Sequence, residues 1–333
     1  ANPYRHLMLV PEIVKLHIKT RNIPHESLMI LPSLLHRIEL LQRAQHLYTS
    51  LHLDFVPLSL ALTSLTTVSA SEAMDLEVLE TVGDMLLKVI IHEHIASKYP
   101  RHSRFHFELY RHCWISNAYQ SALAVNQDVD LWMNTVNFNG KMRLAGFADL
   151  PAAQMATQIT EKQVADCMEA MLGACFEARG MNGAQLFLQN IGLGDCVSRE
   201  RPTEALMPQF PSGYEHISAL EQALGYEWKE KALLLESLTH ESFPSLSLPS
   251  FHRLGLIGDA LFDYFIVMHH SHAVLANPTP GDLTFLKSLG VCGMTQSVIA
   301  HHLKLHTFLL HQSSCLDAHL RQFARRRAGR AVQ

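Results

Sequence analysis

The stretch LEVLETVGDMLLKVIIHEH, residues 76–94, has the apolar spacing of an amphipathic helix but includes two features that weaken a helix. Gly83 lies in its interior, where glycine costs roughly 1 kcal/mol relative to alanine. Glu80 and Asp84 stand four residues apart on one face, where two like charges cost roughly 0.2–0.5 kcal/mol. A helix built only for stability would contain neither feature, so both indicate a further role.

The same pattern recurs 175 residues later in the chain. LETVGDMLLKVIIHEH, residues 79–94, aligns with LGLIGDALFDYFIVMHH, residues 254–270, and Gly83 matches Gly258. The repeat predicts two copies of one helical domain, packed about a pseudo-twofold axis as an intramolecular pseudo-dimer. A glycine at the same place in both copies predicts that another helix approaches each of them closely.

The predicted fold is all-α. The best linker candidate is a segment rich in glycine, proline and charge that separates the two copies. The predicted segments are an N-terminal unit of β and loop character (1–30), a long helix (31–50), a first helical domain (51–191), a linker (192–215) and a second helical domain (216–333). In the long helix, Pro32 fits the first helical position, and Leu34, Ile38 and Leu41 form the predicted apolar stripe.

The composition places the chain in a broad class. Its 333 residues are 48% hydrophobic and 17% charged, with a net charge of −4, which is typical of a globular protein without a general basic surface. Six cysteines without a CxxC pair favour a reducing compartment, the cytoplasm or the nucleus. No apolar run reaches membrane-spanning length and no signal peptide opens the chain, which predicts no membrane partner. The first residue is alanine, so we expect a piece of a longer protein.

Acidic residues gather on one face of each of two predicted helices. Glu77, Glu80 and Asp84 lie opposite the apolar face of the first helix. In TEKQVADCMEAMLGACFEA, residues 160–178, Asp166 and Glu169 stand three residues apart. Each pair has a local alternative explanation, because Lys88 follows Asp84 by four residues and Lys162 precedes Asp166 by four. Such exposed ion pairs contribute only about 0.3–0.5 kcal/mol, so either acidic pair alone is typical of a solvated surface.

Together the two helices suggest a metal centre. If they face each other, four carboxylates converge, and their repulsion requires a cation. Hard oxygen ligands in that number select Mg²⁺, with Mn²⁺ as a substitute. Two such ions roughly 3.5–4 Å apart are the usual arrangement for attack of water on a phosphodiester. The sequence pattern alone does not establish that the helices face each other. None of the 22 histidines offers the HExxH spacing of a zinc site.

These motifs resemble a known family. LEVLETVGD followed by KQVADCMEAMLGA resembles the two signature helices of ribonuclease III domains, and LEQALGYEWKEKALLLESLTHESF, residues 220–243, resembles the start of a second such domain. Tandem domains of this type are characteristic of the Dicer-like ribonuclease III family, and the chain resembles the family's fungal members. LVPEI and ILPSLLHRIELLQRAQHL are similar to the end of a PAZ domain and to the connector helix that follows it, so the resemblance covers nearly the whole chain.

The resemblance implies an endoribonuclease that cleaves double-stranded RNA into small RNAs, as in RNA interference and gene silencing. By position, Glu80, Asp84, Asp166 and Glu169 match the catalytic, metal-binding carboxylates, and Glu77 matches an auxiliary acid. A full family member also contains helicase, complete PAZ and double-stranded-RNA-binding regions. Because duplex RNA displays phosphates and little readable sequence, we name three basic residues as candidate RNA contacts: Arg111, Lys141 and Arg143.

The second copy departs from this pattern. Asp259 matches Asp84, but Gly255 stands where the first copy has Glu80. The offset places the counterparts of Asp166 and Glu169 near positions 341 and 344, beyond the last residue. One acid cannot hold two ions, so the second domain is predicted to be degenerate, C-terminally incomplete and inactive.

Two alternatives to a nuclease remain open at this point. A catalytically silent double-stranded-RNA-binding or assembly scaffold is favoured by the degenerate second copy and opposed by the intact first set of acids. A decaying gene without a stable product would also explain the degenerate copy. If the protein is a nuclease, a homodimer through two first domains would restore cleavage of both strands.

Overall fold

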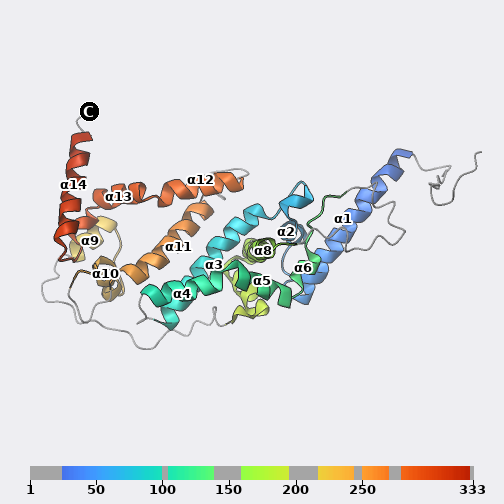
Figure 1. Cartoon of the computed structure of the whole chain (residues 1–333), viewed down its shortest axis with the longest axis horizontal. Helices are drawn as coiled ribbons and strands as arrows, with labels where there is room; N and C mark the ends of the chain where they lie inside the picture. Colours follow the sequence, from blue (N-terminus) through green and yellow to red (C-terminus); the bar gives the residue numbers. More distant parts are fainter. Residues whose placement is uncertain are drawn as a thin grey trace, which may run out of the picture.

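The structure is a computed structural model and describes residues 25–99, 104–138, 159–194, 217–243, 250–269 and 279–330 (Figure 1). All regular elements in these ranges are helices, apart from two isolated parallel bridges, Thr66 with Asn134 and Thr239 with Leu310. The all-α class is therefore confirmed. Most of the predicted N-terminal unit and of the predicted linker lies outside the described residues.

The helices of the first half are α1 (His25–Ser50), α2 (Leu58–Ser64), α3 (Glu77–Lys98), α4 (Arg104–Ile115), α5 (Asn117–Asn126), α6 (Val129–Trp132) and α8 (Glu161–Leu188). Those of the second half are α9 (Ile217–Leu224), α10 (Lys231–Leu238), α11 (His252–His269), α12 (Pro280–Val291), α13 (Gly293–His302) and α14 (Ser314–Arg330). Short helical turns cover Val68–Ala70, Gln189–Leu193 and Leu305–Thr307.

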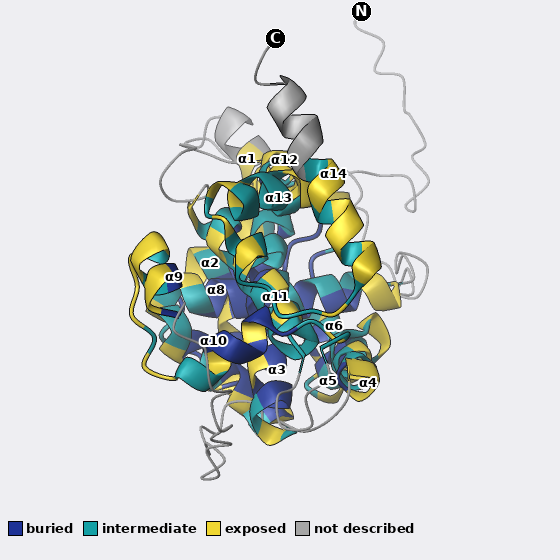
Figure 2. Cartoon of the chain, turned by 90° about the vertical axis from the view of Figure 1, so that its left-hand side faces the viewer, coloured by how far each residue is buried: buried dark blue, intermediate teal, exposed yellow. Residues whose placement is uncertain are grey.

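Helices α3 and α8 pack side by side at the centre of the first domain, where Figure 2 shows mostly buried residues. A Cβ atom on Gly83 would lie only 1.8 Å from the Glu169 carbonyl oxygen, and one on Gly173 only 2.2 Å from the Leu79 carbonyl oxygen. The two backbones therefore approach each other at glycine in both directions. The close neighbour predicted at Gly83 is confirmed.

The start of α8 is stabilised by its own sequence. Thr160 accepts a hydrogen bond from the Gln163 amide at 3.3 Å, and the Gln163 side chain accepts one from the Thr160 amide at 2.9 Å. This capping box satisfies two amide groups that the helix itself cannot pair. The helix continues past the predicted end at residue 178, through a kink at Arg179 and Gly180, where Gly180 has a φ of +61°. The cap fixes where Asp166 and Glu169 fall on the helix.

The connector helix differs from its prediction. Helix α1 begins at His25, so Pro32 lies inside it and not at its first position, at the expense of one intrahelical hydrogen bond. The predicted apolar stripe is also wrong in part, because Leu34 is 52% exposed and Ile38 42% exposed. The C-terminal half of α1 packs on α2 and α6, where its buried residues include Leu40, Ala44, Leu47 and Tyr48, and His36 near its middle stacks on Phe138.

The internal repeat extends to the hydrogen bonds between loops. The Asn134 amide donates to the Leu65 carbonyl at 2.8 Å, and in the second copy the Leu310 amide donates to the Leu238 carbonyl at 2.8 Å. Each bond is part of an isolated parallel bridge at the equivalent place in its own copy. In both copies this bridge joins the end of the second helix to the chain that follows the later helices. Both copies therefore share a local architecture, while the pseudo-twofold arrangement stays a prediction.

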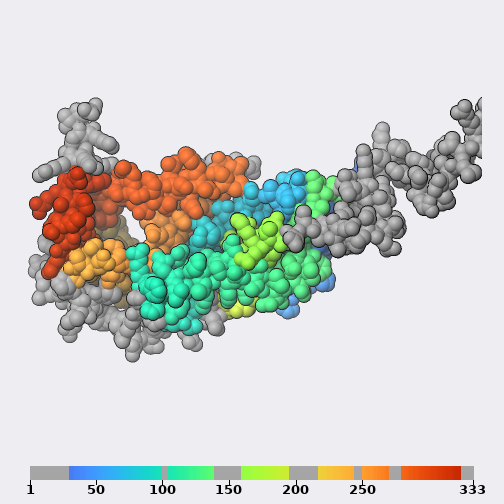
Figure 3. Space-filling model, in the orientation of Figure 1, coloured from blue at the N-terminus to red at the C-terminus, as the bar shows by residue number. Residues whose placement is uncertain are grey.

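The second copy lies against the first through α11 and α12. Both helices contact α3, and the space-filling view shows α12 (orange) beside α3 (light blue) (Figure 3). Val267 and Leu283 belong to the main hydrophobic core that the first domain builds. A smaller, separate core joins α9 and α10 through Ile217, Leu220, Leu234, Leu235 and Leu238.

The second glycine of the repeat behaves differently from the first. No atom lies within 4 Å of the place where a Cβ on Gly258 would stand, so the close neighbour predicted there is wrong for the described residues. Phe262 and Phe265, which match Leu87 and Ile90 of the first copy, are 49% and 63% exposed. In the first copy α8 covers this face, and no described helix does so in the second.

No single described helix is both long and apolar enough to span a membrane. Helices α12 and α13, bent by 44° at their junction, are long and apolar enough as a pair, by length and composition alone.

Candidate metal centre

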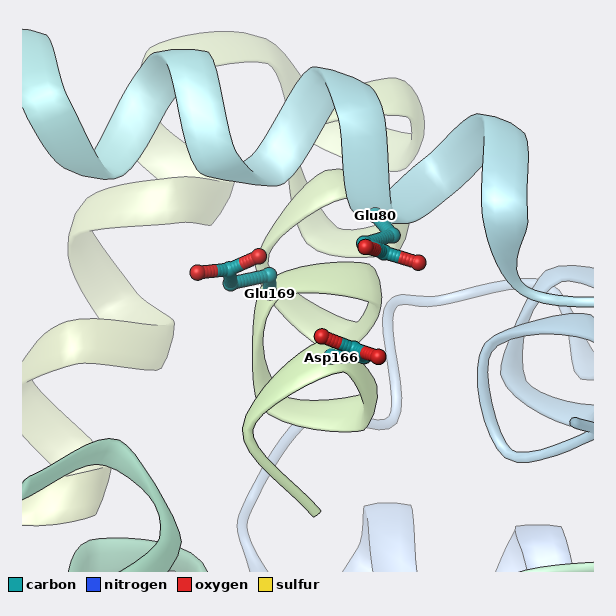
Figure 4. Close-up of side chains that lie close together, drawn as sticks. All are labelled: Glu80, Asp166 and Glu169. Atoms are coloured by element: carbon teal, nitrogen blue, oxygen red, sulfur yellow. The ribbon is translucent and has the colours of Figure 1, made fainter. Parts of the chain in front are cut away.

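Three carboxylates from two helices meet in the first domain. Glu80 projects from α3, while Asp166 and Glu169 project from neighbouring turns of α8, and one oxygen of each lies within 4.8 Å of the others (Figure 4). Among the described residues this is the one group of three or more acidic, histidine or cysteine side chains with the spacing of a metal site. The glycine contact between α3 and α8 brings these two helix faces together.

The electrostatics of this cluster disfavour three negative charges. Burial and, next, the Asp166 carboxylate raise the pKa of Glu80 from 4.5 to about 7. Burial and, next, the Asp84 carboxylate raise the pKa of Glu169 from 4.5 to about 8. Partly buried oxygen ligands that repel one another are suited to a hard divalent cation, which would favour their charged forms. The residues present therefore fit a divalent metal ion.

Asp84 lies beside the cluster and not in it. Its carboxylate accepts a hydrogen bond from the Lys88 ammonium one turn along α3, at 2.6 Å. Its charge nevertheless raises the pKa of Glu169, and that of Glu77 raises the pKa of Glu80. Of the four carboxylates expected to converge, three meet, and Asp84 stands next to them with a lysine partner of its own.

Lysine pairing explains only part of the acidic face. Lys162 lies 2.6 Å from Asp166 and 3.9 Å from Glu80, but its side chain is 65% exposed. An ion pair this exposed contributes little, about 0–1 kcal/mol, because water screens it. A purely solvated surface would not partly bury Glu169 beside these pairs or raise its pKa to about 8. The geometry thus favours a site over the wet-surface alternative.

A cleft of about 220 Å³ opens beside Glu80 and Asp166, and the loop Thr67–Ser69 forms its opposite wall. The Thr67 and Ser69 hydroxyl groups donate to the carbonyl oxygens of Asn134 and Thr135, at 3.1 and 2.7 Å. These bonds hold the wall in place. This loop could not be predicted as part of the site, because nothing in its own residues marks it as such.

The other candidate residues lie elsewhere. Lys141 and Arg143 are outside the described residues. Arg111 on α4 forms an ion pair with Glu108 of the same helix at 2.8 Å. Asp259 and Gly255 are exposed on α11, and neither belongs to a group of metal-ligating side chains among the described residues.

The metal-free protein should lose stability as the pH rises from about 4.5 to about 8. The folded state raises the pKa of Glu80 and Glu169, so their contribution is fully present below 4.5 and is lost as the pH passes through about 7 and 8. Since both groups are partly solvated and coupled, we expect a combined loss on the order of 2 kcal/mol. Urea unfolding with a chelator across this range measures it, and a slope that Glu169→Gln leaves unchanged would contradict it.

Comparison with known proteins gives three related findings. Residues 77–180, which include all five acids, match the family model of the Ribonuclease III domain. The chain is 28% identical over 275 residues to Endoribonuclease Dicer homolog 2a of Oryza sativa subsp. japonica, covering 78% of the chain and 19% of that protein. It is 31% identical over 259 residues to Dicer-like protein 2 of Phaeosphaeria nodorum, covering 74% and 18%. The chain thus spans about a fifth of the length of these relatives.

Proposed function

Because the chain carries a ribonuclease III domain and is related to Dicer and Dicer-like proteins, we propose that it is an endoribonuclease acting on double-stranded RNA. The observation that supports this most directly is the meeting of Glu80, Asp166 and Glu169 on two helices that are held together at glycine. A stable helix pair has no need of three adjoining, partly buried carboxylates, whereas phosphodiester hydrolysis does.

In this proposal Glu80, Asp166 and Glu169 hold Mg²⁺, for which Mn²⁺ can substitute, and Asp84 completes the ligand set of a two-metal site. When bound, the ions supply neutralisation of charge at the scissile phosphate and increase the acidity of the attacking water. The chain contributes the ligand positions, through the close contact at Gly83 and the cap of α8. Glu77 acts indirectly, because its charge favours the protonated form of Glu80 and so couples to metal binding.

The two copies are proposed to have unequal roles. The second copy has Gly255 in place of the matching glutamate, and its exposed Asp259 belongs to no group of three or more metal-ligating side chains among the described residues. The first domain would cut one strand, while the second serves as its packing partner. The longer protein would supply further RNA-binding regions, since the relatives are about five times longer than the matched part.

Duplex RNA labelled on each strand in turn should therefore be nicked in one strand per binding event. Purified monomer with Mg²⁺ or Mn²⁺ is expected to yield a labelled cleavage product. When a chelator is added, no such product is expected. The protein's mass must be measured in parallel, because a homodimer of first domains would cut both strands. Equal cutting of both strands by a monomer would refute the unequal roles. Tight duplex binding without metal-dependent cleavage would instead favour the scaffold function.

A further inference from the structure

Lys88 on α3 and Asp263 on α11 occupy the same place in the internal repeat. The offset of 175 residues that matches Gly83 with Gly258 also matches Lys88 with Asp263. One position of the repeat thus carries opposite charges in the two copies. The two helices pack against each other, although they are far apart in sequence (Figure 1).

A contact between the two helices indicates where they cross. The Arg253 guanidinium on α11 donates to the Ala96 carbonyl oxygen on α3 at 3.5 Å. The offset of 175 residues matches Arg253 with position 78 of the first copy. Counted in the numbering of the first copy, the contact therefore joins positions 78 and 96, and the midpoint between them is position 87. When equivalent helices cross about a twofold axis, positions near the midpoint face their own equivalents. Lys88 and Asp263 lie one residue from that midpoint.

The charges around this crossing alternate in sign. Asp84 pairs with Lys88 at 2.6 Å, and Asp263 pairs with Lys287 of α12 at 3.9 Å. All four side chains are about a quarter exposed. Burial raises the pKa of Asp263, while the ammonium groups of Lys287 and then Lys88 lower it, so Asp263 interacts with a charge on α3 as well as with one from its own copy. Asp84 and Asp259 act on it in the opposite direction.

We propose that the opposite charges at positions 88 and 263 select α11 as the packing partner of α3 and disfavour the pairing of two first copies through this face. A pair of first copies would place one Lys88 beside another, and like charges placed together at a part-buried contact are strongly unfavourable. This selection goes beyond the proposed nuclease function and does not depend on it. It also opposes the homodimer that would cut both strands.

Asp263→Lys in the full chain tests this directly. It gives position 263 a lysine, which is the residue that the first copy carries at the matching position 88. We expect the unfolding equilibrium constant to rise about fivefold or more. Lys88→Asp should have a similar effect, and the charge-swapped double variant should recover most of both losses. Asp259→Lys is the matched control, since Asp259 is exposed one turn away on the same helix.

The proposal is overturned if Asp263→Lys is no more destabilising than Asp259→Lys, or if the two single effects add in the double variant. Should a charge reversal prevent folding, Lys88→Met, Asp263→Asn and their double variant form a milder cycle. The coupling in either cycle should shrink as salt is added, because it arises from charge. A coupling that does not change with salt would indicate packing and overturn the proposal as well.

Discussion

Glu169→Gln is expected to lower metal-dependent RNA cleavage about a thousandfold or more, since the charge stabilisation that divalent ions provide in such sites amounts to several kcal/mol. Glutamine keeps the shape of the side chain and removes one negative charge from the cluster of Glu80, Asp166 and Glu169. Initial rates on duplex RNA, with Mn²⁺ binding followed by calorimetry, measure both effects. Loss of binding and of cleavage together would tie the chemistry to this site.

The same substitution should stabilise the metal-free protein at pH 8. Burial and the neighbouring acids raise the pKa of Glu169 to about 8, so its charged form opposes folding. An inactive variant that is more stable than the wild type cannot be explained by misfolding. Glu177→Gln, at an exposed position on the same helix, is the matched control and should leave metal-dependent cleavage unchanged. Cleavage by Glu169→Gln within threefold of wild type would remove the central support for the proposed nuclease.

Gly83→Ala should destabilise the protein by about 3 kcal/mol, at the upper end of what overpacking usually costs. The added methyl group would lie 1.8 Å from the Glu169 carbonyl oxygen, and a backbone atom inside a helix cannot move aside as a flexible side chain can. Helix α3 would have to shift away from α8, and this would also separate Glu80 from Asp166 and Glu169. Urea unfolding measures the first effect and Mn²⁺ binding the second.

Gly258→Ala offers a control at the matching position of the repeat. No atom of the described residues lies within 4 Å of the added methyl group, so only the helix propensity of alanine acts, and we expect a gain of up to about 1 kcal/mol. The same substitution at equivalent positions should therefore change stability in opposite directions. Equal effects at the two sites would contradict the close contact between α3 and α8.

Local patterns in the sequence were sufficient to predict much of this molecule. The apolar spacing of residues 76–94 predicted an amphipathic helix, and Leu79 and Leu86 of α3 are indeed buried. The lysines four residues from Asp84 and Asp166 do form the ion pairs that their spacing predicts. These features depend on neighbours within one or two helical turns, and that information is contained in a short stretch of chain.

Contacts between distant segments required the tertiary structure. Only the structure shows that Gly83 meets Glu169 while Gly258 meets nothing among the described residues, although the sequence around the two glycines is alike. It also separates Asp84 from the three carboxylates that meet, and it leaves Leu34 and Ile38 of α1 exposed. A periodic pattern specifies which face of a helix is apolar or acidic. Which helix packs against that face depends on long-range packing, because a given face can be covered by any segment of complementary shape.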